Sequence, residues 1–220
     1  MTIHIYGGAL SPFVMRPVLA ARAKGLDISP EAFEGGIKSD AYRALTPMAK
    51  MPLLVDGNFA LPESQVIADY LDAALPGPAL MPADAQAAAR VRLIIRLADL
   101  NLVPHLGGLF RGRDNPDGVA PAMAGLGEGL GFIEHFRNAG DAFAVGDSFT
   151  LADAALIPLF YFFDAFDRAM KTGALVAANP GLAGWWDRAR ASDIGARCVA
   201  EQAAGMKAMM GARAETPKNS

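Results

Sequence analysis

The chain has 220 residues, of which 52% are hydrophobic and 20% are charged, with a formal net charge of -3. This length and apolar content exclude a disordered polypeptide and allow one large domain or two small ones. A weakly acidic chain without a basic half is a poor partner for nucleic acid, and apolar runs broken by charges or proline predict a soluble protein that does not enter a membrane.

Cysteine and histidine are scarce in this sequence. Cys198 is the single cysteine, and His4, His105 and His135 are scattered along the chain. One thiol excludes a disulfide scaffold and a thiolate zinc site, and the histidines lack metal-ligand spacing. We therefore expect no metal and a reducing, cytoplasmic setting. The opening residues MTIHIYGG have no basic region and no long apolar run, so a cleaved signal peptide is not expected.

Strand and helix patterns alternate in the first third of the chain. In order, they predict a strand at 2–6, a helix at 13–24, a weaker strand at 28–33, a short helix at 38–45, strands at 52–55 and 59–61, and a helix at 63–74. Gly25 is a typical helix stop, and Asp56-Gly57 between two apolar runs is a strong hairpin signal. This order predicts a small mixed sheet covered by helices.

The character of the sequence changes after Pro76-Gly77-Pro78, which cannot continue a helix. Alanine, leucine and arginine then dominate, and strand signals disappear. The apolar spacing predicts helices at 85–109, 120–138, 151–170, 180–191 and 194–211. We therefore predict an α/β domain over residues 1–78 and an all-α domain over residues 85–213.

Three short motifs at the starts of elements have both a structural and a functional explanation. They are Ser11-Pro12-Phe13, Met51-Pro52 and Pro62-Glu63-Ser64. Structurally, serine and proline are common at helix starts, and proline is common at a strand start. Functionally, a hydroxyl and free amides at a helix N-terminus favour an anion. A cis-proline would leave the preceding backbone free to pair with an extended peptide.

Together these motifs resemble the cytosolic glutathione S-transferases, over nearly the whole chain. Ser11-Pro12-Phe13-Val14 is similar to the serine version of the first-helix motif of that family. Segment 46–54 is similar to its Asn-Pro-x-Gly-x-Val-Pro-x-Leu segment, and segment 63–67 to its Glu/Gln-Ser-x-x-Ile segment. Segment 149–153 is similar to its buried helix start, which is physically a capping box. The resemblance implies a thioredoxin-like N-terminal domain, an all-α C-terminal domain and a homodimer.

The resemblance also implies roles for individual residues. Ser11 would donate a hydrogen bond to the glutathione sulfur and so favour the thiolate. The residues implied to bind the rest of glutathione are Phe13, Lys38, Lys50, Met51, Pro52, Glu63 and Ser64. Among these, the Met51 backbone would pair with the cysteinyl part, Glu63 and Ser64 would hold the γ-glutamyl end, and one of the two lysines would meet the glycyl carboxylate.

The sequence departs from the family pattern in the loop before Pro52. Thr46, Ala49 and Met51 replace the commoner Asn, Gly and Val, so we expect this loop to lie differently. Serine rather than cysteine at position 11, with Cys198 near the C-terminus, disfavours thiol-disulfide exchange.

A hydrophobic electrophile is the second substrate that the resemblance implies. The candidate pocket residues are Leu10, Leu102, His105, Leu106 and Phe110. Core packing is the alternative explanation for each of them. Arg111 and Arg113 could meet an acidic substrate or belong to a solvated loop, and Asp99 could act across a dimer axis.

The sequence thus predicts a glutathione transferase that uses a serine hydroxyl and no metal, with glutathione as co-substrate and a role in detoxification. A glutathione-dependent isomerase or an ether-cleaving enzyme of the same family remains an alternative. So does a non-catalytic protein that binds glutathione or another ligand. The electrophile cannot be read from the sequence, because one pocket methylene changes discrimination by only about 1–3 kcal/mol.

Overall fold

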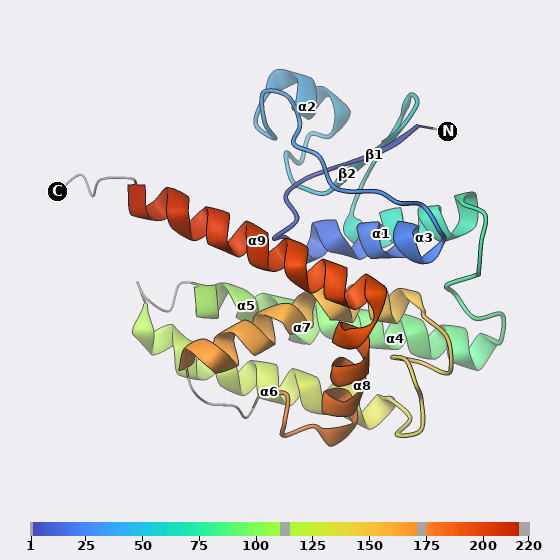
Figure 1. The fold of residues 1–220 in the computed structure, drawn as a ribbon, viewed down its shortest axis with the longest axis vertical. Helices are drawn as coiled ribbons and strands as arrows, with labels where there is room; N and C mark the ends of the chain where they lie inside the picture. The colour runs from blue at the N-terminus through green and yellow to red at the C-terminus, as the bar shows by residue number, and fades with distance from the viewer. Residues whose placement is uncertain (1, 111–114, 171–174, 216–220) are drawn as a thin grey trace. The chain divides into compact units, whose positions relative to one another are not determined.

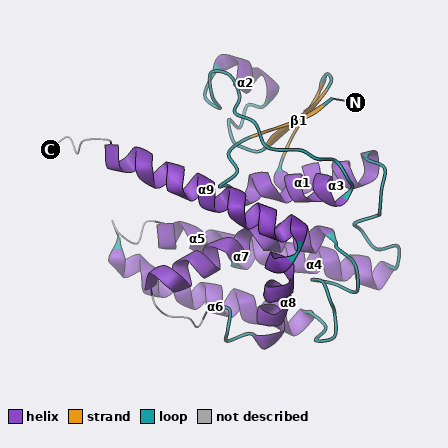
Figure 2. Cartoon of the chain, in the orientation of Figure 1, coloured by secondary structure: helices purple, strands orange, loops and turns teal. Residues whose placement is uncertain are grey.

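The computed structural model describes residues 2–110, 115–170 and 175–215, and these form two compact units (Figures 1 and 2). One unit comprises the chain up to Pro78 together with helix α9 (Asp193–Glu215), and the other comprises residues 79–192. The chain passes from one unit to the other after Pro78. The sequence predicts that this last helix belongs to the all-α domain over 85–213, whereas in the structure α9 belongs to the first unit. It groups with the first unit because it packs against α1 (Pro12–Ala23).

A three-stranded antiparallel sheet forms the centre of the first unit. Strand β1 (Ile3–Tyr6) pairs with β2 (Leu53–Asp56), which pairs with β3 (Phe59–Pro62). Strands β2 and β3 are the hairpin that Asp56-Gly57 predicts. Gly57 has a φ of 59°, a value that glycine adopts at no steric cost.

The weaker strand predicted at 28–33 is reduced to one parallel bridge between Tyr6 and Glu31. The residues before Glu31 bind other partners. The Ile28 carbonyl accepts a hydrogen bond from Arg22 Nε at 2.9 Å, and the Asp27 carboxylate pairs with Arg197 Nη1 at 2.6 Å. These contacts draw the segment toward the helices and away from the edge of β1.

Helices cover this sheet as the sequence predicts. Helix α1 packs along α3 (Ser64–Ala74), and the short helix α2 (Asp40–Leu45) precedes β2 (Figure 1). Apolar residues at helical spacing face the sheet and are fully buried, together with strand residues: Ile5, Val14, Val18, Leu54, Ile67 and Leu71. Burial of such side chains contributes about 1.5–3 kcal/mol each, so this core holds α1 and α3 against the sheet.

The described part of the second unit consists of helices joined by loops and contains no strand. Its elements are α4 (Ala85–Asn101), α5 (Val103–Phe110), the 3-10 turn η1 (Pro116–Gly118), α6 (Val119–Phe136), α7 (Leu151–Met170) and α8 (Pro180–Ala191). The single helix predicted at 85–109 is therefore two helices that divide at Leu102. Pro104 explains the division, because proline lacks the N–H of an inner helical turn and its ring clashes with the carbonyl four residues earlier.

At the start of α7, the acidic half of the capping box predicted at 149–153 is present, with Asp153 reaching back to Thr150. Asp153 Oδ2 accepts hydrogen bonds from the Thr150 N–H at 2.9 Å and the Thr150 hydroxyl at 2.8 Å. Its Oδ1 accepts from the Ala144 N–H at 2.8 Å and from Trp185 Nε1 at 2.9 Å. Asp153 is 1% exposed, so the carboxylate organises the start of α7, as the structural explanation predicts.

One described stretch, residues 85–110, is long and apolar enough to cross a membrane by length and composition alone. It covers both α4 and α5. Helix α4 packs against α6 and α7, and α5 packs against α6. A core helix of a soluble protein passes the same test, so this stretch alone does not indicate a membrane protein.

Candidate active site

A hollow of about 220 Å³ in the first unit brings together the motifs of the sequence analysis. It is lined by Phe13, Met48, Lys50, Met51, Pro52, Pro62, Glu63 and Ser64. Apart from Met48 and Pro62, every lining residue is one that the resemblance assigned to glutathione. Met48 lies inside segment 46–54 and Pro62 directly precedes Glu63, so their positions in and next to the motifs are the sequence signal that points to them. Ser11 and Lys38 are not among the lining residues.

The loop before Pro52 forms one side of the hollow. The Met51-Pro52 peptide bond is cis, as predicted. Ala49 has a φ of 48°, where the family more often has glycine. The left-handed conformation raises the energy of an L-residue by about 1–2 kcal/mol, so contacts of the neighbouring residues must stabilise this loop. The buried Tyr42 contributes to that, because its hydroxyl donates to the Lys50 carbonyl at 2.7 Å. Burial raises the pKa of Tyr42, so the phenol remains a donor.

The N-terminus of α3 forms the opposite side. Glu63 is the N-cap residue by position, with a φ of 73° and a ψ of 111°, and its side chain makes no capping hydrogen bond. Ser64 is 8% exposed, and its hydroxyl makes no hydrogen bond with any described residue. Helix capping therefore does not account for this pair. An unusual backbone conformation beside a hydroxyl that lines a hollow is typical of a ligand-binding position.

Ser11 occupies the N-cap position of α1 with extended backbone angles, φ -71° and ψ 124°. Its carbonyl accepts from the Val14 and Met15 amides, at 3.1 and 3.0 Å. Its hydroxyl makes no capping hydrogen bond, so the capping role considered for this side chain is not seen. The chain before Ser11 passes close to the cis-proline loop, since a Cβ on Gly7 would lie 3.3 Å from Met51 Cβ.

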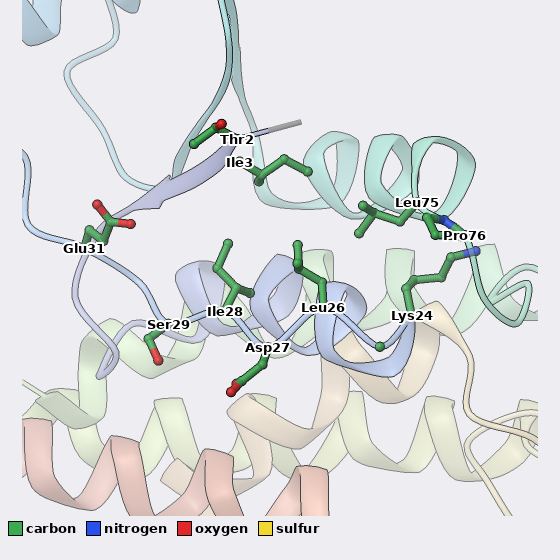
Figure 3. A pocket seen from close by; sticks show the side chains of 11 residues that line it. Thr2, Ile3, Lys24, Leu26, Asp27, Ile28, Ser29, Glu31, Leu75 and Pro76 are labelled. Carbon is green, nitrogen blue, oxygen red and sulfur yellow. The ribbon is translucent and has the colours of Figure 1, made fainter.

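A larger hollow of about 690 Å³ lies elsewhere in the first unit, between Ile3 on β1, Ile28 and Leu75 (Figure 3). It contains none of the predicted site residues. Its charged side chains are already paired, with Lys24 Nζ 3.1 Å from Asp72 Oδ1 and Glu31 Oε1 3.1 Å from His4 Nδ1. Volume alone therefore does not identify the chemistry, and the smaller hollow is the better candidate.

The residues predicted for the second substrate lie in both units. Leu10 belongs to the first unit and contacts α9, and the other four belong to the second. Leu102 and Leu106 are buried in the helical core. The His105 ring lies against the backbone of Gly125 in α6, where a Cβ would overlap it. Leu102 and Leu106 are thus part of the helical core, whereas His105 is half-buried, and a pocket role for these three residues stays a prediction.

Phe110 differs from its neighbours because it is 40% exposed. Its ring makes edge contacts with Phe162 and Phe166 at centroid distances of 5.1 and 5.3 Å. It is thus the predicted pocket residue of this unit that presents an aromatic surface. Arg111 and Arg113 lie outside the described residues, and Asp99 is half-buried on α4.

The thiol of Cys198, the single cysteine, has low reactivity. Cys198 is fully buried in α9, and burial raises its pKa to about 12. This confirms the structural interpretation of Cys198. Among the described residues, no group of three or more His, Cys, Asp or Glu side chains is arranged to hold a metal ion.

Comparison with known proteins agrees with this geometry. Residues 5–79 match the family described as "Glutathione S-transferase, N-terminal domain", and residues 116–188 match "Glutathione S-transferase, C-terminal domain". The chain is 29% identical to glutathione S-transferase 3 of Zea mays over 84% of this chain and 87% of that protein. It is 30% identical to maleylacetoacetate isomerase of Pseudomonas aeruginosa over 83% and 93%. The solved structure of glutathione S-transferase III in its apo form matches with a TM-score of 0.75, at 28% identity over 91% of this chain and 96% of that one.

Proposed function

Because this chain belongs to the glutathione S-transferase family, we propose that it catalyses attack of the glutathione thiolate on an apolar electrophile. The hollow beside Met51-Pro52 supports this most directly, because it gathers the glutathione motifs of three separate segments. Addition would form a C–S bond and leave a carbanion or enolate for protonation. Displacement would form the same bond and release a leaving group. In either case the protein has to supply a thiolate and place the electrophile beside it.

The arrangement suits the two ends of a tripeptide. The first amides of α3 and the free Ser64 hydroxyl would hold the γ-glutamyl carboxylate, since a helix N-terminus favours an anion. The exposed Lys50 would meet the glycyl carboxylate in preference to Lys38, because only Lys50 lines the hollow. The backbone of Met51 would pair with the cysteinyl part in the manner of an added strand.

Ser11 is the proposed group for thiol activation. A thiol with a pKa of about 8.5 is mostly protonated at neutral pH, and lowering that pKa by about 2 units requires roughly 2.7 kcal/mol of preferential thiolate stabilisation. One hydroxyl donor to a charged acceptor contributes about 1.5–3 kcal/mol, and a helix N-terminus adds up to about 1 kcal/mol. A free hydroxyl at the start of α1 is therefore sufficient, without a metal or a general base.

The first prediction concerns Ser11→Ala. We expect the pKa of bound glutathione to rise by about 1–2 units, with a fall in turnover at neutral pH of about 10- to 100-fold. Because the thiolate is the reactive form, turnover of the variant should recover as pH rises toward the new pKa. Ultraviolet difference titration of the thiolate and a pH profile of kcat/KM measure both effects.

Ser29→Ala is the matched control, because Ser29 is an exposed serine of the same unit whose one recorded side-chain contact is 3.4 Å from Arg197 Nη2. It should leave the thiol pKa unchanged. An unchanged thiol pKa in Ser11→Ala would remove Ser11 from the mechanism. Absence of glutathione binding to the wild-type chain at millimolar concentration would reject the proposed function as a whole.

A glutathione-dependent isomerase is the second candidate, favoured by the 30% identity to a protein named maleylacetoacetate isomerase. In that reaction glutathione adds and is then eliminated, so it is not consumed. With maleylacetoacetate as substrate, isomerisation at constant glutathione concentration would select this candidate. Loss of free thiol, one equivalent per turnover, would select conjugation.

Homodimer formation, a cytoplasmic location and a role in detoxification remain predictions from the family resemblance. Exposed apolar side chains on the second unit are compatible with a dimer, which would bury surface of this kind. Examples are Leu93 and Leu100 on α4 and Phe132 and Phe136 on α6.

A further inference from the structure

A second hollow with ligand-like chemistry lies wholly within the helical unit. It has a volume of about 160 Å³ and is formed by the start of α7, one face of α8 and the loop between α6 and α7. We propose that this hollow, termed the α8 pocket, binds the ring of a small aromatic carboxylate, with the carboxylate group meeting Arg188. It shares no lining residue with the glutathione hollow, so the two sites can be tested separately.

The walls of the α8 pocket fit one aromatic ring. Phe143 and Phe149 contribute rings whose centroids lie 6.4 Å apart with an interplanar angle of 72°. Ile157 and the 1% exposed Trp185 complete the apolar lining. An engineered apolar cavity of about 150 Å³ in another protein holds benzene, so the space here accommodates one ring and does not accommodate two.

Helix α8 places a positive charge at the same pocket. Arg188 and Ala189 lie three and four residues after Trp185, so both are neighbours of Trp185 on one side of the helix. Arg188 is exposed, and its Nε donates to the Ala142 carbonyl at 3.2 Å while its Nη2 donates to the Asp141 carbonyl at 3.3 Å. Its other N–H groups have no acceptor among the described residues and can bind a carboxylate.

The charges around the pocket favour an anion over a cation. Arg137 is 6% exposed and donates to backbone carbonyls, those of Gly181, Asp141 and Phe143. Burial, and after it the charge of the nearby Arg188, lowers the pKa of Arg137. On the acidic side, Asp153 already accepts four hydrogen bonds, and burial raises its pKa. Of the charged residues that line the pocket, a ligand therefore meets unused donors on Arg188 and a satisfied carboxylate on Asp153. Asp141 does not line the pocket, and its buried Oδ2 has no hydrogen-bond partner among the described residues.

The chain carries a reporter for this site. It has two tryptophans, and only Trp185 lines the pocket, with its indole N–H donating to Asp153. We would titrate the full chain with benzoate, benzylamine and acetate and follow the assigned indole N–H resonances by NMR. Benzoate should shift the Trp185 resonance with a Kd on the order of 1 mM, as expected for a fragment-sized ligand. Benzylamine and acetate should bind at least about tenfold more weakly.

Variants of α8 separate charge from shape. Arg188→Gln should weaken benzoate binding about tenfold. Arg190→Gln removes the same charge from the same helix at a residue that pairs with Asp164 and Asp187 and does not line the pocket, so it should leave benzoate affinity unchanged. Ala189→Leu should fill the pocket and abolish binding.

Two results would overturn the proposal: equal affinity for benzylamine and benzoate, or equal loss of benzoate affinity in the two arginine variants. Retained glutathione binding would show that a variant is folded. If glutathione binding itself proved absent in the wild type, the benzoate titration would still stand, because it reads the Trp185 resonance and no turnover.

Discussion

At the scale of single residues, the hydroxyls of Ser11 and Ser64 differ from other polar groups at helix starts in the same chain. Ser39 accepts a hydrogen bond from the Tyr42 amide at 3.2 Å, and Asp84 accepts from the Ala87 amide at 2.8 Å. Those two side chains are used as caps, whereas Ser11 at the start of α1 and Glu63 at the start of α3 make no such bond, and Ser64 follows Glu63 as the first residue of α3. Serine is found both as a cap, at Ser39, and with a hydroxyl that caps nothing, at Ser11, so only the structure separates the two.

Tyr42 offers a residue-scale test of how the cis-proline loop is held. Tyr42→Phe removes the hydroxyl that donates to the Lys50 carbonyl while keeping the buried ring. Loss of one buried hydrogen bond costs about 1 kcal/mol, so we expect the Kd for glutathione to rise about fivefold. The pKa of the bound thiol should stay constant, because the phenol does not belong to the thiolate site.

Calorimetric titration of glutathione and ultraviolet titration of the thiolate check the two parts of this prediction. The thiolate titration also separates the roles of Tyr42 and Ser11. If Tyr42→Phe raised the thiol pKa as much as Ser11→Ala, then Tyr42 would act on the sulfur and its role as a support of the loop would be wrong.

At the scale of elements, α9 contacts Leu10, the residue that precedes the proposed catalytic serine. Gln202 is fully buried, and its Nε2 lies 3.5 Å from the Leu10 carbonyl. A Cβ on Gly205 would lie 3.0 Å from Leu10 Cβ and 3.2 Å from the Leu10 backbone nitrogen. The absence of a side chain at Gly205 thus lets α9 lie against the backbone next to Ser11.

Gly205→Ala should therefore displace Leu10 by a few tenths of an ångström and misalign Ser11. We expect kcat to fall about threefold to tenfold and the thiol pKa to rise, with a smaller change in KM. Gly211→Ala is the control, because a Cβ there meets nothing within 4 Å and the gain in helix propensity is the same on the same helix. Equal kinetics for the two variants would show that α9 does not position the serine.

The sequence predicts the elements better than their partners. Apolar spacing is a local signal, so α7 and α8 begin and end where the pattern places them. The prediction of a full strand at 28–33 was wrong. Arg22 and Arg197 bind the residues at the start of this segment, and Arg197 is too far away in the sequence for a local pattern to report the contact. The cis-proline loop was predicted through the family motif, but the unused state of the Ser64 hydroxyl has no local signature. Patterns report what a segment can form, and long-range contacts decide which of its groups remain available.

At the scale of the whole molecule, the first unit is built from both ends of the chain. Arg22 in α1 donates to Glu201 in α9 through Nη1 at 2.9 Å and Nη2 at 2.8 Å. Arg197 Nε donates to the same carboxylate at 3.1 Å and Nη1 binds Asp27 at 2.6 Å. The Arg22 side chain is 4% exposed, so this carboxylate neutralises a charge that is otherwise buried.

Removal of Glu201 should therefore destabilise the unit far more than removal of a surface acid. We expect Glu201→Ala to lower the free energy of unfolding by about 3 kcal/mol, because it leaves a buried guanidinium unpaired. Asp187→Ala breaks an exposed pair with Arg190 and should cost less than about 1 kcal/mol. Urea denaturation followed by circular dichroism measures both. The double variant Arg22→Met, Glu201→Leu should recover most of the loss, because it removes both buried charges together. If it were no more stable than Glu201→Ala, the loss would arise from packing of α9 and the unpaired charge would not be its cause.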